Sequence, residues 1–174
     1  RIGFDAGGSD RKVSAVIDGQ AVYSEEVVWS PKLNSDPKYH YDGILSAMKT
    51  AASHMPRVDA IGVSSAGVYI DNRIMIASLF LKVPDEEFDK HVKNMYLDVA
   101  KEIGENIPVE VANDGDVTAL AGAMDLNDDS VLGVRLCGHV RRRGTHDRHE
   151  RAEASVCGED WLGDGRLFGR VQRN

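Results

Sequence analysis

A carboxylate and two glycines stand between two strand-like segments near the start of the chain, in the run Ile2-Gly3-Phe4-Asp5-Ala6-Gly7-Gly8-Ser9. The apolar-rich run Val13 to Ile17 follows at once. Glycine admits positive φ and has no Cβ, so the backbone amides of such a turn can point at an anion. A carboxylate at a strand end can hold a metal ion that bridges phosphates. The segment predicts a phosphate-binding turn, although a glycine pair after a strand is more often an ordinary hairpin turn.

Composition limits the partners that this turn could serve. The 174 residues include 21 Lys and Arg against 28 Asp and Glu, a formal net charge of -7. Such an acidic balance argues against nucleic acid as a partner, whereas backbone amides and a divalent metal can still hold a small anion. No apolar run approaches the roughly 20 residues that span a bilayer, and no signal peptide is recognisable. We therefore expect a small-molecule ligand, no nucleic acid and no membrane.

Two cysteines, Cys137 and Cys157, do not indicate a disulfide framework and favour a reducing cytoplasm. The length suits one well-cored domain and a fraction of another. Because the chain begins at Arg1 without a methionine, we expect that a few residues precede it.

The first part of the chain predicts an antiparallel meander. Its strands are Arg1 to Asp5, Lys12 to Ile17 and Ala21 to Trp29, and Asp18-Gly19 is a strong hairpin signal between the last two. A loop over Ser30 to His40 follows, with two prolines.

Helices and buried strands alternate after the meander. The spacing predicts a helix over Tyr41 to His54 and a buried strand over Val58 to Val63, which ends in the small-residue loop Ser64 to Gly67. A hairpin is expected around Asp71-Asn72. The remaining predicted elements are a helix over Asp85 to Ile103 closed by Gly104, a strand over Pro108 to Val111, a turn and N-cap over Asn113 to Asp116, a helix over Val117 to Met124 and a strand over Val131 to Val134.

This order predicts an α/β fold of the ribonuclease H-like kind, with a three-stranded antiparallel meander followed by parallel strands alternating with helices. Three segments in it resemble successive motifs of the sugar kinase/Hsp70/actin ATPase superfamily, and most of all its ROK-type and N-acetylglucosamine-kinase-like branches. They are Asp5 to Ser9, Gly62 to Gly67 and Val111 to Leu120. The resemblance covers residues 1–134, the expected amino-terminal lobe, and depends on all three motifs together because each alone is weak.

The resemblance implies ATP and Mg²⁺ as cofactors. It places Gly7, Gly8 and Ser9 near the β- and γ-phosphates, together with Arg11. It also implies that Asp5 acts on the magnesium through water, in agreement with the reading of the residues themselves.

The third motif implies a catalytic residue. Asp114 corresponds to the general base that takes the proton of the attacking sugar hydroxyl, and an alternative role is to cap the helix that starts near Gly115. Asn113 with Ser64 and Ser65 would hydrogen-bond substrate hydroxyls. Because the commoner ROK form has proline-glycine in the second motif where this chain has Ala66-Gly67, the sugar is left unspecified.

Residues 135–174 depart from the family pattern. Nine of the thirteen arginines and both cysteines fall there, whereas all eight lysines lie at or before Lys101. One hypothesis is a slipped reading frame near Val134, because Gly138 to Gly144 can be encoded so that a start one nucleotide later gives Gly-Thr-Ser-Ala-Ala-Gly, the motif expected there. Resequencing the gene at that codon tests it. The alternatives are a natural, poorly ordered arginine-rich tail and a zinc site, whose candidate ligands are Cys137, His139, His146, His149 and Cys157.

The function predicted is therefore that of the amino-terminal lobe of an ATP-dependent sugar kinase-like protein, incomplete without a second lobe. The face that such a lobe would cover is expected to be apolar and prone to self-association, which suggests a homodimer. Two other classes stay open: a non-catalytic ligand-sensing or interaction lobe of a ROK-type regulator, and a ribonuclease H-like nuclease. The nuclease needs several carboxylates on two metals, and the acidic balance argues against it.

Overall fold

The computed structural model describes residues 1–127, 131–135, 161–162 and 166–170, the last three ranges as backbone only. The chain divides into two units, residues 1–114 and 115–174, and each is described by itself. The boundary predicted after residue 134 stays a prediction. The arginine-rich run, the motif of the frame-slip hypothesis and the candidate zinc ligands lie outside the described residues.

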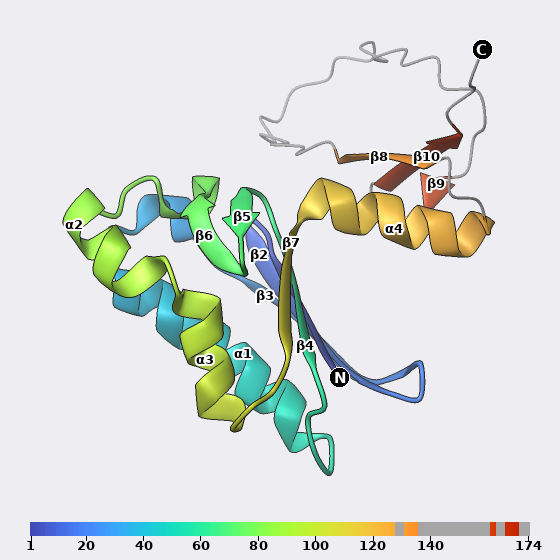
Figure 1. Cartoon of the computed structure of the whole chain (residues 1–174), viewed down its shortest axis with the longest axis horizontal. Coiled ribbons are helices and arrows are strands. Elements are labelled where there is room, and N and C mark those ends of the chain that lie inside the picture. The colour runs from blue at the N-terminus through green and yellow to red at the C-terminus, as the bar shows by residue number, and fades with distance from the viewer. Residues whose placement is uncertain (128–130, 136–160, 163–165, 171–174) are drawn as a thin grey trace, which may run out of the picture. The chain divides into compact units, whose positions relative to one another are not determined.

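Unit 1 is built on a five-stranded sheet with the order β3-β2-β1-β4-β7 (Figure 1). The strands β1 (Ile2–Ala6), β2 (Asp10–Ile17) and β3 (Gln20–Val28) form the predicted antiparallel meander. The strands β4 (Ile61–Ser65) and β7 (Val109–Asn113) continue the sheet parallel to β1. The mixed sheet confirms the predicted α/β class of a ribonuclease H-like lobe.

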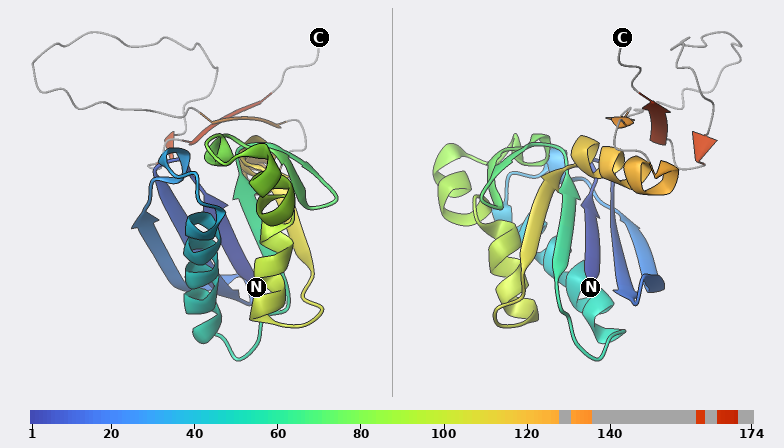
Figure 2. Two further views of the ribbon diagram at one scale, coloured as in Figure 1. Left: turned by 90° about the vertical axis from the view of Figure 1, so that its left-hand side faces the viewer. Right: turned by 45° about the vertical axis from the view of Figure 1, so that its right-hand side comes forward.

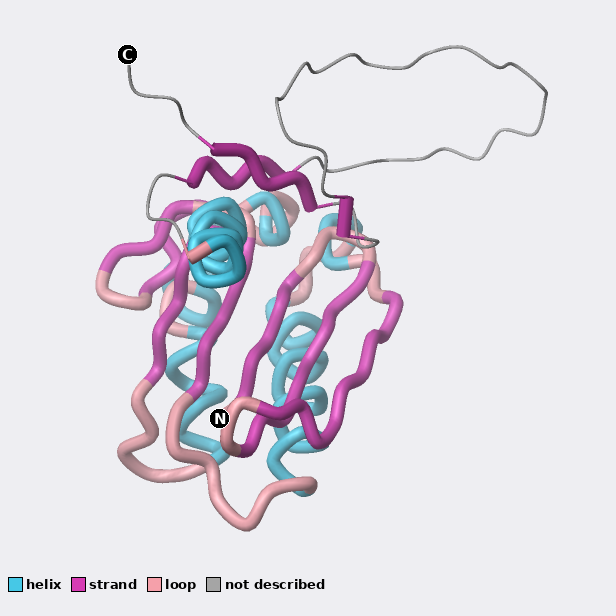
Figure 3. The backbone as a smooth tube through the Cα atoms, turned by 90° about the vertical axis from the view of Figure 1, so that its right-hand side faces the viewer, coloured by secondary structure: helices cyan, strands magenta, loops and turns pink. Residues whose placement is uncertain are grey.

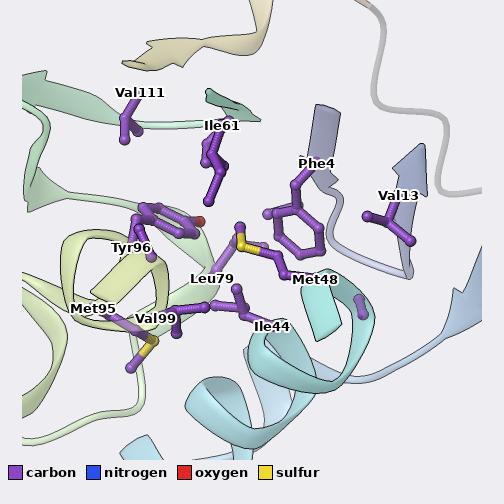
Figure 4. Packing of buried hydrophobic residues seen from close by; sticks show 14 of the residues in the cluster. Phe4, Val13, Ile44, Met48, Ile61, Leu79, Met95, Tyr96, Val99 and Val111 are labelled. Atoms are coloured by element: carbon purple, nitrogen blue, oxygen red, sulfur yellow. The ribbon is translucent and has the colours of Figure 1, made fainter. Parts of the chain in front are cut away.

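Two helices lie side by side on one face of this sheet, as the two views of Figure 2 show. Side chains alternate along each strand, so Phe4 of β1 and Val13 of β2 point toward the helices and are buried. They pack with Ile44 and Met48 of one helix and Tyr96 of the other (Figure 4). Each fully buried apolar side chain of this kind stabilises the fold by about 1.5–3 kcal/mol.

The first helix, α1 (Pro37–Ser53), begins four residues earlier than predicted. The side chain of Asp36 accepts a hydrogen bond of 2.9 Å from the backbone N–H of Lys38, and Pro37 occupies the first helical position. This N-cap and proline pair starts a helix because both satisfy or remove orphan amide donors. A one-turn helix, η1 (Pro31–Leu33), lies in the preceding segment.

The single helix predicted over residues 85–103 is wrong, because the segment is broken into α2 (Asp85–Glu87), the π-helical turn η3 (Phe88–Val92) and α3 (Met95–Ile103). The carbonyl of Lys93 accepts a hydrogen bond of 2.9 Å from the N–H of Ile74 in another element. Because that carbonyl bonds outside the helix, the regular pattern of helical hydrogen bonds is interrupted at Lys93. The apolar stripe of side chains nevertheless continues across the interruption.

The predicted hairpin at Asp71-Asn72 is present as β5 (Val68–Ile70) and β6 (Arg73–Ile76), and both turn residues have positive φ. Asn72 also covers the exposed edge of the sheet. Its Nδ2 donates to the carbonyl of Val109 at 2.9 Å, and its Oδ1 accepts from the N–H of Val111 at 2.7 Å. The hairpin is thereby tied to β7. A further one-turn helix, η2 (Ser78–Phe80), follows it.

Two strands end later in the sequence than predicted. The strand β4 does not begin at Val58 but runs from Ile61 through Ser65, so both serines of the predicted loop belong to it. The strand β7 continues through Asn113, and α4 (Asp114–Leu126) follows without the predicted turn. The last residue of β7 is therefore followed directly by the first residue of α4.

Unit 2 contains most of α4 and a three-stranded antiparallel sheet of order β8-β10-β9. The strand β8 (Val131–Arg135) confirms the strand predicted at Val131 to Val134. The other two, β9 (Trp161–Leu162) and β10 (Arg166–Arg170), come from the segment for which no structure is predicted.

His40 of α1 should be a main stabilising residue of unit 1, because its buried ring lies against three backbone carbonyls. Its Nδ1 is 3.0 Å from the oxygen of Asp36, and its Nε2 is 3.0 Å from that of Pro31 and 3.3 Å from that of Leu79. We predict that His40→Ala lowers the free energy of unfolding by about 2–4 kcal/mol in urea titration. The exposed His91→Ala is the matched control, and equal stabilities for both variants would contradict this assignment.

Candidate functional site

The three predicted motifs meet at one edge of the sheet. Because β1, β4 and β7 are parallel, their carboxyl ends lie at the same edge of the sheet. Figure 3 shows the strands of the sheet in magenta, with the helices behind them. The register pairs Asp5 with Ser64, and Ala6 with Ser65, which in turn pairs with Asn113. Ligands of open α/β sheets bind at this edge.

The turn after β1 requires glycine for space, not for an unusual backbone angle. Positive φ is found at Gly19 and Gly67 but at neither Gly7 nor Gly8, so that part of the sequence argument is wrong. A Cβ on Gly7 would lie 2.6 Å from the carbonyl oxygen of Asp10, closer than atoms can approach. The turn is therefore held tightly at Gly7, as a backbone that approaches a phosphate must be.

Trp29 fixes this turn from the end of β3. Its indole Nε1 donates to the carbonyl of Gly7 at 2.8 Å, and its backbone N–H donates to the carbonyl of Ser9 at 3.0 Å. The indole is buried, so neither bond competes strongly with water. This anchor is not predictable from a local motif, because the contact spans 22 residues, and the one signal for it is a tryptophan directly after a strand.

Lys32 is a second residue near this turn that lies outside the three predicted motifs. It lies in η1, three residues after Trp29, and its side chain extends over the glycine turn. A Cβ built on Gly8 would lie 2.9 Å from Lys32 Cε and 3.0 Å from Nζ. A cation thus stands beside the predicted phosphate-binding turn.

Arg11 faces away from Asp5. It shares the helix-covered face of β2 with Val13, and its guanidinium carbon lies 5.6 Å from the centre of the Trp29 ring. A Cβ on Gly43 of α1 would be 3.2 Å from one of its terminal nitrogens, so the group fills the space between helix and indole. Its Nε is buried without a hydrogen-bond partner. The predicted phosphate contact of Arg11 stays a prediction.

Ser64 and Ser65 point to opposite faces of the sheet. Ser64 shares the open face with Asp5 and is partly exposed, whereas Ser65 is fully buried on the helix side. The Ser65 hydroxyl lies in a cluster with the phenols of Tyr69 and Tyr96, which interact with it although neither is placed at good hydrogen-bond geometry. The two rings are 6.4 Å apart.

Burial keeps both phenols neutral. It raises the pKa of Tyr69 to about 12; the Ser65 hydroxyl opposes the rise, and the carboxylate of Asp114 adds to it. Burial also raises the pKa of Tyr96, with smaller contributions that include Tyr69 and the carboxylate of Asp5. The two predicted acidic site residues therefore act on the same buried hydroxyl cluster.

The loop between β4 and β5 is held from two sides. The Tyr69 hydroxyl donates to the carbonyl of Ala66 at 3.3 Å, and Asn113 Nδ2 donates to the carbonyl of Gly67 at 2.8 Å. Gly67 has φ 155°, and a Cβ there would lie 2.6 Å from the Ile76 oxygen. Glycine is required here, and Asn113 joins the second motif to the third.

Asp114 is the first residue of α4 and is partly buried. The helix begins at Asp114, one residue before the predicted start near Gly115, and the alternative that Asp114 caps it stays a prediction. Its predicted role as a base stays a prediction.

The side chains at this edge could hold a magnesium ion only if a bound phosphate supplied further oxygen ligands. Among the described residues, no group of three or more His, Cys, Asp or Glu side chains could hold a metal ion. Asp5 supplies one carboxylate, and Mg²⁺ commonly takes one or two carboxylates with water and phosphate oxygens. The residues present therefore fit a metal that arrives with a phosphate.

A separate depression of about 390 Å³ lies between the start of α1 and the α2 to α3 segment. Its lining carries both signs of charge and none of the predicted site residues: Asp36, Pro37, Lys38, Tyr41, Glu87, Lys90, His91 and Asp98. In the described part of the chain, no helix has the length and apolar character to cross a membrane.

Comparisons with known proteins locate the fold. No family model matches the chain, and neither does any curated protein. Among solved structures, a ROK hexokinase from Thermus thermophilus is 20% identical with a TM-score of 0.49, over 76% of this chain and 39% of that one. A putative sugar kinase from Cytophaga hutchinsonii is 15% identical with a TM-score of 0.51, over 70% and 38%.

The second match establishes the fold, which this chain shares with 38% of the Cytophaga hutchinsonii protein. The chain spans about two fifths of the length of these two solved chains. The predicted resemblance to the sugar kinase superfamily is confirmed at the level of the fold.

We predict that Ser65→Ala changes the free energy of unfolding by less than about 1 kcal/mol, because the buried hydroxyl lies beside the two phenols without a partner at good hydrogen-bond geometry. Thermal unfolding measures this effect, with Ser64→Ala on the open face as the matched control. A loss of more than about 1.5 kcal/mol in Ser65→Ala would show that the hydroxyl is paired in solution.

Proposed function

We propose that this chain is the amino-terminal lobe of an ATP-dependent sugar kinase-like protein that transfers a phosphoryl group from Mg-ATP to a sugar hydroxyl. The observation that carries the proposal is the register at the sheet edge, where Asp5 and Ser64 are paired and Asn113 precedes Asp114. Phosphoryl transfer is mostly positioning and electrostatic stabilisation, so such an edge supplies most of what one lobe must contribute.

The turn at Gly7, Gly8 and Ser9 would hold the β- and γ-phosphates. The close approach of Gly7 to Asp10 and the two hydrogen bonds from Trp29 support this role, because they fix the turn before a ligand arrives. A preorganised turn does not have to be ordered when the phosphates bind. Arg11 would act on the same turn from behind, through its stacking on Trp29.

Asp5 would hold the magnesium through water. When bound, Mg²⁺ neutralises the charge that develops on the phosphate oxygens. Asp5 itself keeps a carboxylate at the strand end beside Ser64, on the sheet face opposite the core.

Asp114 would accept the proton of the attacking hydroxyl at its carboxylate. Its place at the start of α4, directly after Asn113, supports this role because one residue can orient the sugar while the next takes the proton. Ser64 and Ser65 would contribute to the substrate side, Ser64 from the open face and Ser65 through the buried cluster.

Turnover would require a second lobe, because the chain spans about two fifths of the sugar kinases that it matches in fold. That lobe would supply much of the adenosine site and of the sugar pocket. With two cysteines in the whole sequence, a reducing cytoplasm is the compartment that we propose.

Calorimetric titration of the chain with Mg-ATP tests the proposal. We expect binding that needs magnesium and that Asp5→Ala abolishes, because the carboxylate is the one protein ligand assigned to the metal. Asp114→Asn should bind Mg-ATP as the unmodified chain does, because the proposed base acts on the sugar.

Asp59→Ala is the matched control, since this exposed aspartate pairs with Arg57. It lies just before the amino end of β4, at the end of the strand opposite the site. Absence of Mg-ATP binding by the unmodified chain would contradict the proposal, and so would equal binding by the Asp5 and Asp59 variants.

A further inference from the structure

The segment that carries Lys32 is built against the glycine turn. Trp29 ties its start to Gly7 and Ser9 through the two hydrogen bonds described above. Pro31 is buried, and its carbonyl accepts hydrogen bonds from His40 Nε2 at 3.0 Å and from the N–H of Asn34 at 3.1 Å. The backbone on both sides of Lys32 is therefore fixed, and the freedom left is that of the lysine side chain.

The amine end of that side chain lies over Gly8. The distances from a Cβ built there, 2.9 Å to Cε and 3.0 Å to Nζ, put the ammonium group in the space that a larger residue at position 8 would need. Gly8 itself is exposed, so this space opens to solvent and to any ligand of the turn.

Lys32 is a cation available to such a ligand on the exposed side of the turn, whereas Arg11 lies behind the turn against the Trp29 ring. Lys12, the other lysine nearby, is paired with Asp10 at 3.1 Å. Within residues 1–127, whose side chains are described, Lys32 makes no ion pair or hydrogen bond. An ammonium group beside an exposed turn favours a phosphate anion, because its charge attracts the anion and Gly8 has no side chain to block the approach.

Resting on the proposed function, we infer that Lys32 is a ligand of the terminal phosphates, held over the glycine turn by the segment from Trp29 to Asn34. The inference extends the phosphate site to a residue outside the three sequence motifs. It also assigns a specificity: the contact lies at the turn, so it acts on the polyphosphate and not on the nucleoside.

Calorimetry with Mg-ATP, magnesium tripolyphosphate and AMP tests this inference on the full chain. Tripolyphosphate is included because its binding does not depend on an adenosine site. We expect Lys32→Met to weaken the binding of Mg-ATP and of tripolyphosphate by about tenfold, the usual effect of losing one charge-assisted contact. Lys32→Arg should stay within about threefold, since it keeps the charge. Any AMP affinity should be the same in all variants.

Lys38→Met is the matched control, because Lys38 lies in the next element, is exposed and pairs with Asp42. Circular dichroism checks that each variant is folded, and Lys32→Gln replaces Lys32→Met should the latter not fold. Binding by the unmodified chain that Asp5→Ala abolishes and Lys32→Met leaves unchanged overturns the role of Lys32 alone. No polyphosphate binding by the unmodified chain overturns this inference and the proposed function together.

Discussion

The parallel pairing of β1 with β4 and of β4 with β7 is the constraint on which the rest of unit 1 depends. The register joins Ala6, Ser65 and Asn113 across the three strands, so three segments that lie far apart in the sequence end at one edge. A shift by one residue would exchange the two faces of a strand. It would bury Asp5 among the apolar residues that pack against α1 and α3, and would expose Phe4. The apolar core and the candidate site therefore specify the same register.

Around that edge, residues outside the strand ends hold the loops. Trp29 holds the turn after β1, and Asn113 holds the loop after β4 through the carbonyl of Gly67. Asn72 ties the β5–β6 hairpin to β7, and the hairpin carries Tyr69, whose hydroxyl donates to Ala66. Each loop of the site is thus fixed by a polar side chain from another segment, which is how a scaffold preorganises a binding site.

Local chemistry in the sequence was sufficient for much of the fold. The meander and its Asp18-Gly19 turn, and the second hairpin at Asp71-Asn72, are set by residues that tolerate positive φ, so the structure confirms them. The start of α1 was equally local, since Asp36-Pro37 is a strong helix-start signal, but the prediction missed it inside a loop with two prolines. The break at Lys93 was not local, because its cause is a hydrogen bond from Ile74.

The residues of the candidate site likewise include some that local motifs indicate and some that only distant contacts bring to the site. Asp5, Gly7 and Asn113 could be proposed from the sequence because each belongs to a short motif with its own physical purpose. The predicted strand ends at Val63, which assigns neither serine to a face of the sheet, so the separation of Ser64 from Ser65 required the true bounds of β4. Trp29 and Lys32 could not be found from motifs, because both reach the glycine turn from a segment more than twenty residues further along the chain.

The most direct test of the central claim is a nuclear magnetic resonance titration of the ¹⁵N-labelled chain with Mg-ATP, which reports the backbone amides individually. If the three strand ends form one phosphate site, the shifts will concentrate at Gly7 to Ser9, with a second group at Ser64 to Gly67 and at Asn113. Shifts confined to the depression at the start of α1, around Lys38 and Tyr41, would contradict the account, as would a spectrum that does not change.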